Sequence, residues 1–438
     1  RSSAASDVYK RQASHNAKIL TSGSGFRISV RFAKGEKFYL ERILKKLSDT
    51  KRELVFTFVF ALVLILLAFL PTGFEKQIYI NAEGARATVL ATDESGVYRT
   101  GLLTQGDQRC TVRIESGSHK GKEAEATNLF TGKLEFDKMF VPGDDAWVLI
   151  ERDAQNNIVF VNMVDHYRIP QELILVGLFA VMLIVFSGFT GVRTLLSFAF
   201  ALMSIWKILI PFMLQGVNPL LVALVVGNII TVATLLLVAG FTRRAYCAIA
   251  GSVVCSMFTC LMAVAFGELF KVHGAVMQWS ESLLYAGYEN IDLTGIFQAG
   301  IYLACSGAIL DLAIDISAAL NEVVVNNPNV SRKALVTSGL SIGRSVVGSQ
   351  TTTLLLAYMG SYISVMMVYM AQGTPMMNIL NSKSISAEIL HTFVGCVGLV
   401  LVSPLTSAIC GFVYAGKRKN NTLAEATPAV PSMAGTPE

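Results

Sequence analysis

The sequence predicts an α-helical polytopic membrane protein with about eight transmembrane helices and one inserted, small all-β (barrel-like) extracytoplasmic domain. Hydrophobic residues make up 53% of the 438 residues, and the mean hydropathy is +0.53. Charged residues make up only 15%, whereas soluble domains carry about a quarter. Several apolar runs are long enough to cross a bilayer. One stretch, residues 72–170, instead alternates polar and apolar residues, as half-buried strands do.

The N-terminal part of the chain is polar and basic and precedes an anchor. Within residues 1–53, we interpret residues 1–12 as foreign to the natural protein, because they resemble no targeting sequence. Residues 54–71 are uncharged and end at Pro71. This run is longer than the apolar core of a cleavable signal peptide, so we expect an uncleaved transmembrane helix. The basic residues before it predict that segment 1–53 is cytoplasmic.

Residues 72–170 are predicted to form the extracytoplasmic β domain. Cys110, Val112 and Ile114 alternate with polar neighbours, and turn sequences such as TQGD and PGDD separate the short runs. Several short strands at this spacing indicate a small barrel or sandwich. Cys110 is the domain's one cysteine, and we expect external thiol reagents to reach it. The sequence has no CxxC pair or Cys/His cluster, so we expect no structural metal and no cofactor.

Residues 171–416 are predicted to form a seven-helix membrane domain. The spans are expected at 172–189, 194–214, 219–241, 245–270, 294–320, 351–371 and 388–415. Lys and Arg gather in alternate loops, which predicts cytoplasmic N- and C-termini and an external β domain. Segment 335–350 is polar and Gly-rich, so we predict an interfacial or re-entrant segment, with a helix break permitted at Gly343 and Gly348. Residues 417–438 are predicted to be a disordered cytoplasmic tail.

Three acidic residues interrupt the apolar span that begins at residue 294. Asp311, Asp315 and Glu322 are spaced so that they project within about 40° of one another on a helix. A charge at the centre of a membrane helix costs about 2.5–3.5 kcal/mol, so the three acids indicate a water-filled interior or a bound cation. We predict an ion or proton site there. The alternative is that Asp315 and Glu322 lie at the cytoplasmic end of the helix and simply reach water.

A second polar cluster covers residues 338–358, SGLSIGRSVVGSQTTTLLLAY. Its small residues also suit close helix packing. Arg344 is expected at the depth of Asp311 and Asp315, where an ion pair with a carboxylate would cost less than an unpaired charge. Neutral oxygens suited to a substrate or a dehydrated ion come from Gln350, Thr351 and Thr352.

The stretches GAILDLAIDISAALNEV and GRSVVGSQTTTLLLAYMGS resemble the signature of the YibE/F-like family of bacterial multi-pass membrane proteins. In the β segment, SGSHKGKEAEATN, PGDDAWVLI and VDHYRIPQEL are similar to that family's extracytoplasmic domain. The resemblance covers residues 54–415. It implies a permease or efflux protein of unestablished substrate in a bacterial plasma membrane.

Two functions follow from these observations. The first is a gradient-driven permease or secondary transporter, in which Asp311 and Asp315 bind an ion and Arg344 is their switchable partner. The second is a non-transporting membrane scaffold or sensor that binds a ligand or partner through the β domain. A water-filled cavity that reaches Asp311 would favour the first, and fully paired acids in a dry bundle would favour the second.

The sequence gives little support to an enzyme, because it has no HExxH motif and no second helix with a membrane-embedded aspartate. The expected partners are the lipid bilayer, an ion or small-molecule substrate, and another copy of the chain or a partner membrane protein. Nucleic acid is not expected, since the net charge is only +5 and the basic residues gather at helix ends.

Overall fold

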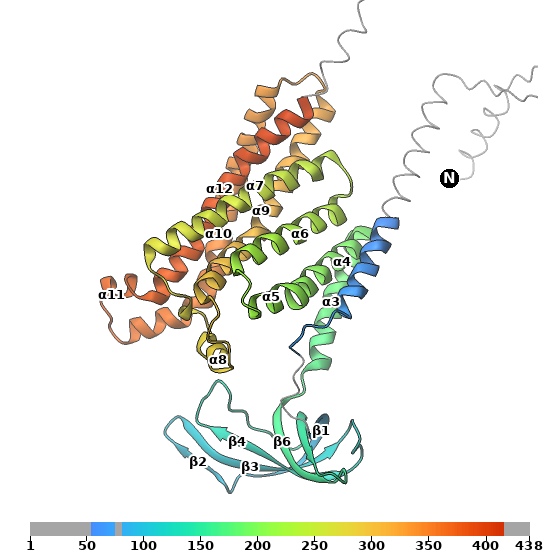
Figure 1. Ribbon diagram of the computed structural model, residues 1–438, viewed down its shortest axis with the longest axis vertical. Helices are drawn as coiled ribbons and strands as arrows, with labels where there is room; N and C mark the ends of the chain where they lie inside the picture. The colour runs from blue at the N-terminus through green and yellow to red at the C-terminus, as the bar shows by residue number, and fades with distance from the viewer. Residues whose placement is uncertain (1–53, 75–80, 416–438) are drawn as a thin grey trace, which may run out of the picture. The chain divides into compact units, whose positions relative to one another are not determined.

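The computed structural model describes residues 54–74 and 81–415, so the predicted terminal segments 1–53 and 417–438 lie outside the described part. The chain divides into two compact units (Figure 1). We name Leu70–Leu195 with Trp206–Pro211 the β unit, and the remainder the helical unit.

The β unit contains a closed barrel. Its strands are β1 (Ala82–Asp93), β2 (Val97–Thr100), β3 (Leu103–Ile114), β4 (Glu123–Thr131), β5 (Asp145–Arg152) and β6 (Ile158–His166). The sheet order is β1-β5-β6-β4-β3-β2, and β3 also pairs with β1, which closes a ring of five strands. β4 and β6 are parallel, while the other pairs are antiparallel. This five-stranded Greek-key arrangement is also that of the OB-fold, and the predicted small barrel is confirmed.

The barrel interior follows the predicted alternation along β3. Cys110, Val112 and Ile114 are buried, whereas Arg109 and Arg113 are exposed. Only 1% of Cys110 is exposed, and burial raises the pKa of its thiol to about 11. The expectation that external thiol reagents reach Cys110 is therefore wrong for the folded barrel, because the side chain belongs to the core face of its strand.

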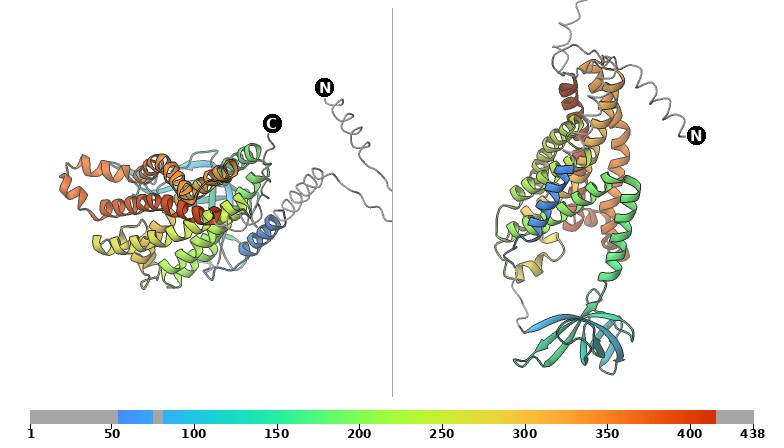
Figure 2. Two further views of the ribbon diagram at one scale, coloured as in Figure 1. Left: turned by 90° about the horizontal axis from the view of Figure 1, so that it is seen from above. Right: turned by 90° about the vertical axis from the view of Figure 1, so that its right-hand side faces the viewer.

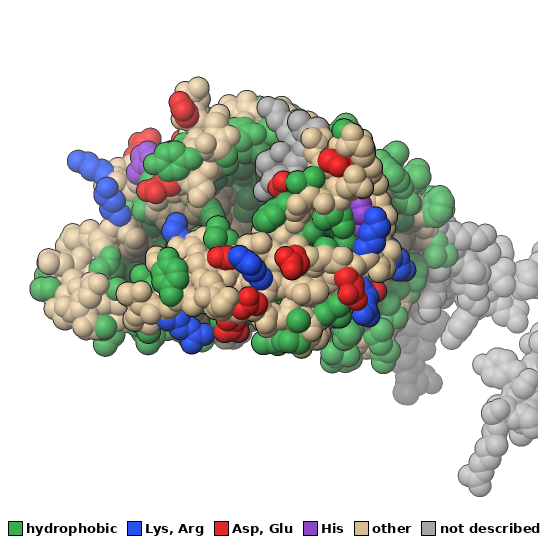
Figure 3. Space-filling view, turned by 90° about the horizontal axis from the view of Figure 1, so that it is seen from below, with side chains coloured by type: hydrophobic (Ala, Val, Ile, Leu, Met, Phe, Trp, Pro, Cys, Tyr) green, Lys and Arg blue, Asp and Glu red, His purple; other side chains and the backbone are tan. Residues whose placement is uncertain are grey.

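Buried amides fix the connection between β4 and β5 to the barrel. The Gln108 Nε2 group donates to the Phe140 carbonyl oxygen (2.8 Å), and the Phe140 N–H donates to Gln108 Oε1 (3.1 Å). Asn128 Nδ2 donates both to Gln108 Oε1 and to the Lys138 carbonyl oxygen. The outer face is different, since acidic and basic side chains are interspersed on it (Figure 3).

Helix α3 (Ile169–Ser187) follows the barrel directly, and its exposed apolar side chains are typical of a helix that faces lipid. None of its residues is buried within the protein, and its mean hydropathy is 2.3. The next helix is formed by α4 (Phe189–Ser204), the π-helical segment η1 (Ile205–Leu209) and α5 (Ile210–Leu214). Lys207, within the π-helical segment, donates its Nζ proton to the Leu70 carbonyl oxygen (3.0 Å), so its charge meets a backbone dipole.

The helical unit is built on α6 (Pro219–Ala239), α7 (Arg243–Phe270), α9 (Leu293–Asn326), α10 (Arg332–Ala371) and α12 (Lys383–Ala415). Shorter elements are η2 (Gly274–Val276), α8 (Ser280–Tyr285), α11 (Met376–Leu380) and the helix Leu54–Ala68. Within the described residues, 6 helices are long and apolar enough to cross a membrane, and 7 if the bent α10 counts as one span. The expected total of eight additionally needs Leu54–Ala68, which is a shorter apolar helix.

Helix α10 runs without interruption through the segment predicted to be broken. It bends instead by 63° between Arg332–Gly360 and Tyr362–Ala371. The helix break that the sequence permits at Gly343 and Gly348 does not occur in this structure. Gly343 serves close packing, because a methyl group there would collide with the Ser403 side chain on α12, whereas one on Gly348 would meet nothing within 4 Å.

Glycines set the approach of the other helices as well. A methyl group on Gly395 of α12 would lie 2.7 Å from Cys305 Sγ on α9, and one on Gly398 would lie 2.7 Å from Thr259 Oγ1 on α7. Such small residues let membrane helices pack backbone to backbone. α7, α9, α10 and α12 accordingly run alongside one another in both Figure 1 and Figure 2. The buried apolar side of α9 comprises Ile301, Ile309, Leu312, Ile316 and Leu320.

Candidate functional site

The predicted acids lie on one side of α9. Asp311, Asp315 and Glu322 are all exposed, while Leu312 and Ile316 beside them are completely buried. Asp311 and Asp315 are close enough to interact electrostatically. The same exposed side continues toward the start of the helix through the small residues Gly300, Ala304 and Gly307. We name these six residues the α9 stripe.

Arg344 lies on α10, a packed neighbour of α9, and is also exposed. The ion pairs of the described residues include none between Arg344 and Asp311 or Asp315. The expected pair is therefore not formed in this structure. α10 buries Leu335, Gly339 and Gly343 and turns Arg344 outward. Among the described helices, no packed neighbour therefore holds the outward guanidinium against one partner.

The predicted neutral ligands are half-buried or exposed on α10. Gln350 and Thr351 are half-buried, and Thr352 is exposed. Thr351 Oγ1 donates to the Val347 carbonyl oxygen (2.9 Å), and Thr352 Oγ1 donates to that of Gly348 (3.2 Å). Their hydroxyl hydrogens are thus used inside the helix, while the hydroxyl oxygens keep lone pairs that can accept a hydrogen bond or contact a cation.

The sequence reasoning missed one buried cluster. Glu388 and His391 lie three residues apart on α12, and Glu388 is only 7% exposed. The Tyr358 ring of α10 stacks on the His391 ring, with centroids 4.3 Å apart. The signal was the spacing E-x-x-H, which puts both side chains on one helix face. The sequence analysis does not single out Glu388, which is the first residue of the predicted span 388–415.

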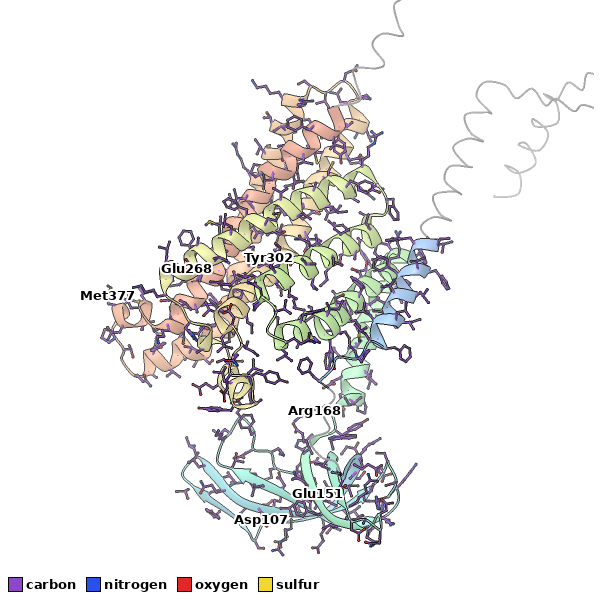
Figure 4. All side chains as sticks on the ribbon, in the orientation of Figure 1. Asp107, Glu151, Arg168, Glu268, Tyr302 and Met377 are labelled. Carbon is purple, nitrogen blue, oxygen red and sulfur yellow. The ribbon has the colours of Figure 1, made fainter. Side chains whose placement is uncertain are left out.

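A further buried group marks the middle of the helical unit. Tyr302, labelled in Figure 4, is 1% exposed, and a methyl group on Gly227 of α6 would lie 2.6 Å from its hydroxyl oxygen. On the neighbouring helix pair, the Ser256 hydroxyl donates to Asn228 Oδ1 (2.9 Å). These contacts join α6, α7 and α9. We assign them to packing, since Gly227 lets α6 approach the Tyr302 ring closely.

The described residues contain no group of three or more His, Cys, Asp or Glu side chains that could hold a metal ion. Asp311 with Asp315, and Glu388 with His391, are pairs only. Such pairs suit a proton or a weakly held cation, because structural metal sites usually need about four protein ligands.

The barrel carries two hollows on its outer wall, which share Trp147. One of about 400 Å³ extends along Asp165–Ile169 to Glu172, and the other, of about 450 Å³, lies over Leu129, Leu149 and Val164. Trp147 stacks on Tyr167 at 5.9 Å, and the Arg86 guanidinium lies 5.4 Å from the centre of the Tyr167 ring.

Comparison with known proteins assigns the family. The family described as YibE/F-like protein matches residues 175–416, more than half of the chain. The chain belongs to the YibE/F-like family. The match runs from α3 to the end of α12, so it includes the α9 stripe and the Glu388–His391 pair of this YibE/F-like protein and leaves the barrel outside. No curated protein and no solved structure matches the chain.

Proposed function

We propose that this YibE/F-like protein is a gradient-driven permease of a bacterial plasma membrane. Its barrel is then extracytoplasmic and both termini are cytoplasmic, as the distribution of Lys and Arg indicates. The observation that carries the proposal is that Asp311 and Asp315 are exposed on a membrane-spanning helix without a cationic partner among the described residues. Such charges facing lipid would be costly, so this side of α9 faces water, an ion or another polar surface.

The α9 stripe supplies the chemistry of an ion site. Asp311 and Asp315 are neighbours on one helix face, and a cation or proton between them relieves the repulsion of two carboxylates. Gly300, Ala304 and Gly307 leave space along the same side for a polar path. Arg344 is then the switchable partner, which pairs with the carboxylates after the ion leaves. This accounts for the position of Arg344, which lies on a neighbouring helix but forms no ion pair with Asp311 or Asp315 in this structure.

Flux through proteoliposomes tests the proposal. The full chain is reconstituted with an entrapped pH indicator, and gradients of H⁺, Na⁺, K⁺ and Mg²⁺ are applied one at a time together with a panel of metabolites. Asp311→Asn should abolish the coupled flux, because an amide neither takes up a proton nor neutralises a cation. Glu322→Gln is the matched control from the end of the stripe and should retain most of it. Full flux in both Asp311→Asn and Asp315→Asn would refute the assignment.

A second candidate is supported by the hollows beside Trp147. A scaffold or sensor would bind an apolar or aromatic ligand there, since pockets with aromatic walls and a few polar groups are typical binding sites. Trp147→Ala separates the two functions. It should leave flux intact in the permease, whereas in a sensor it should abolish ligand-dependent changes in the fluorescence of the barrel.

A further inference from the structure

Helix α12 carries a glutamate and a histidine that the proposed permease site does not use. At about 1.5 Å per residue, Glu388 lies about 7 Å and His391 about 12 Å along the helix from its start at Lys383. Both are therefore inside a helix that is long and apolar enough to span a membrane. Lys383 and Asp311 are exposed, whereas Glu388 is buried.

Polar atoms of this cluster lack protein partners. Glu388 Oε1, His391 Nε2 and Thr392 Oγ1 are buried, and none has a hydrogen-bond partner among the described residues. A buried polar atom without a partner costs about 1–3 kcal/mol, and more when it is charged. In native structures a buried polar atom without a protein partner marks a bound water or ion, stored strain or a functional role.

The neighbouring side chains provide no positive charge. α10 contributes Tyr358, stacked on His391, and Tyr362, which lies within electrostatic reach of Glu388. α9 contributes Cys305, whose Sγ is 3.9 Å from the Tyr358 hydroxyl. Other titratable residues toward this end of the described helices include Cys396 on α12 and the exposed side chains of Lys383, Glu268, Lys271, His273 and Asp292.

We propose that Glu388 and His391 form a buried proton-binding site, separate from the α9 stripe. A proton taken from water binds a Glu388 carboxylate oxygen and converts it to a neutral carboxylic acid, which removes the cost of burying a charge without a counter-ion. His391 Nε2 is the second proton acceptor in the cluster when the ring hydrogen is on Nδ1, and release returns the proton to water. Two ligands are too few for a typical zinc site. As a coupling site the pair rests on the proposed function, but proton binding itself does not.

Infrared difference spectroscopy tests the site in the full chain in lipid nanodiscs. A step in pH should produce the carbonyl stretching band of a protonated carboxylic acid. Glu388→Gln should remove that component, and Glu388→Asp should displace it without removing it. Asp311→Asn with Asp315→Asn is the matched control, which removes two carboxylates elsewhere and should leave the Glu388 component in place. A spectrum that is unchanged by Glu388→Gln would overturn the proposal.

Nuclear magnetic resonance of labelled histidines gives a second readout. The chain has 5 histidines, so His391→Gln identifies the His391 signal by its loss. Glu388→Gln should shift the pH range over which His391 titrates and leave the His119 signal of the barrel unchanged. An unaltered His391 titration would argue against one shared site. If the chain instead binds one Zn²⁺ and Glu388→Gln abolishes that binding, the ligand of the site is a metal ion and not a proton. Absence of flux in the unmodified protein would refute the permease and leave these spectra as expected.

Discussion

The barrel has a buried histidine, His119, and the helical unit has a half-buried one, His391, whose Nε2 atom is buried; the two differ in their partners. In the barrel, His119 has a partner on both ring nitrogens: Nδ1 lies 3.0 Å from Ser118 Oγ and Nε2 lies 2.9 Å from the Asn156 carbonyl oxygen. In the helical unit, the Nε2 atom of His391 has no partner among the described residues. The comparison teaches that the barrel uses its buried histidine to fix two loops, whereas His391 keeps a ring nitrogen without a protein partner among the described residues.

The barrel and the helical unit also differ in the contacts that determine their packing. The barrel is specified by alternation along strands and by amide bonds such as that between Gln108 and Phe140. The helices are specified by close contacts at glycine, such as Gly343 against Ser403. Substitutions should therefore damage the helices by volume and the barrel by the loss of hydrogen bonds.

The largest effect should come from added volume between α10 and α12. Gly343→Val should destabilise the helical unit, because the added methyl groups meet Ser403. The loss should reach or exceed the upper end of the range of about 1–3 kcal/mol that is typical of overpacking. The measurement is the fraction of monodisperse protein after heating in detergent. Gly348→Val is the matched control on the same helix, where the side chain would enter open space. Equal loss in both variants would show that general helix propensity, and not contact with α12, is responsible.

Cys110 should be protected from thiol reagents in the folded barrel. Only the thiolate reacts, and burial raises the pKa of Cys110 from an ordinary 9.0 to about 11. Near neutral pH its thiolate is thus about 100-fold rarer than that of an exposed cysteine. Mass spectrometry after maleimide treatment should show labelling of an added Gln155→Cys but of Cys110 only in urea. Since the unfolded chain releases this proton at lower pH than the folded barrel, the stability of the barrel should fall between pH 9 and 11. Labelling of Cys110 in the native protein as fast as that of Gln155→Cys would contradict its burial.

Loss of the Gln108 side chain should loosen the connection between β4 and β5. Gln108→Ala leaves the Phe140 N–H and the Asn128 amide without that partner, at a cost of about 1–3 kcal/mol. Peptides covering β3 and residues 133–144 should exchange amide hydrogens faster in the full chain. Gln155→Ala, on an exposed turn, should have no effect. Unchanged exchange in Gln108→Ala would mean that water satisfies these groups equally well.

The smallest effect is expected for the coupling between Asp311 and Arg344. Because the two are unpaired from each other in this structure, the thermal stability losses of Asp311→Asn and Arg344→Gln should add, with a coupling of at most about 0.3–0.5 kcal/mol. A larger coupling in a double-mutant cycle would support the ion pair that the sequence predicts and place it in another conformation of the protein.

Much of the architecture could be predicted from local pattern. Alternation at Cys110, Val112 and Ile114 indicated the strand, and its inward face is the one observed. The break at Gly343 could not be excluded from sequence, because a glycine that ends a helix and one that admits a neighbouring helix look the same until the neighbour is known. Ser403, the neighbour in question, lies on a distant helix.

The candidate site was predictable only in part. The spacing of Asp311 and Asp315 is enough to place both on one face of a helix. Whether Arg344 meets them depends on which face of α10 packs against α12. Gly339 and Gly343 determine that face, but this becomes clear only when the position of α12 is known. Glu388 was missed because a charge near the end of an apolar run is usually solvated, and its burial depends on Tyr358 and Tyr362 arriving from another helix.

Closure of the barrel restricts how this domain can meet another protein. β1 and β3 pair with each other, so neither offers a long free edge on that side to which an incoming strand could be added. Among the described strands β2 lies at the end of the sheet order and is only 4 residues long, and short edges of this kind discourage strand-to-strand aggregation. The outer wall, where Trp147 lies, therefore offers a partner more surface than the short edge of β2, and a peptide inhibitor against this domain is better designed as a wall binder than as a strand added to β2.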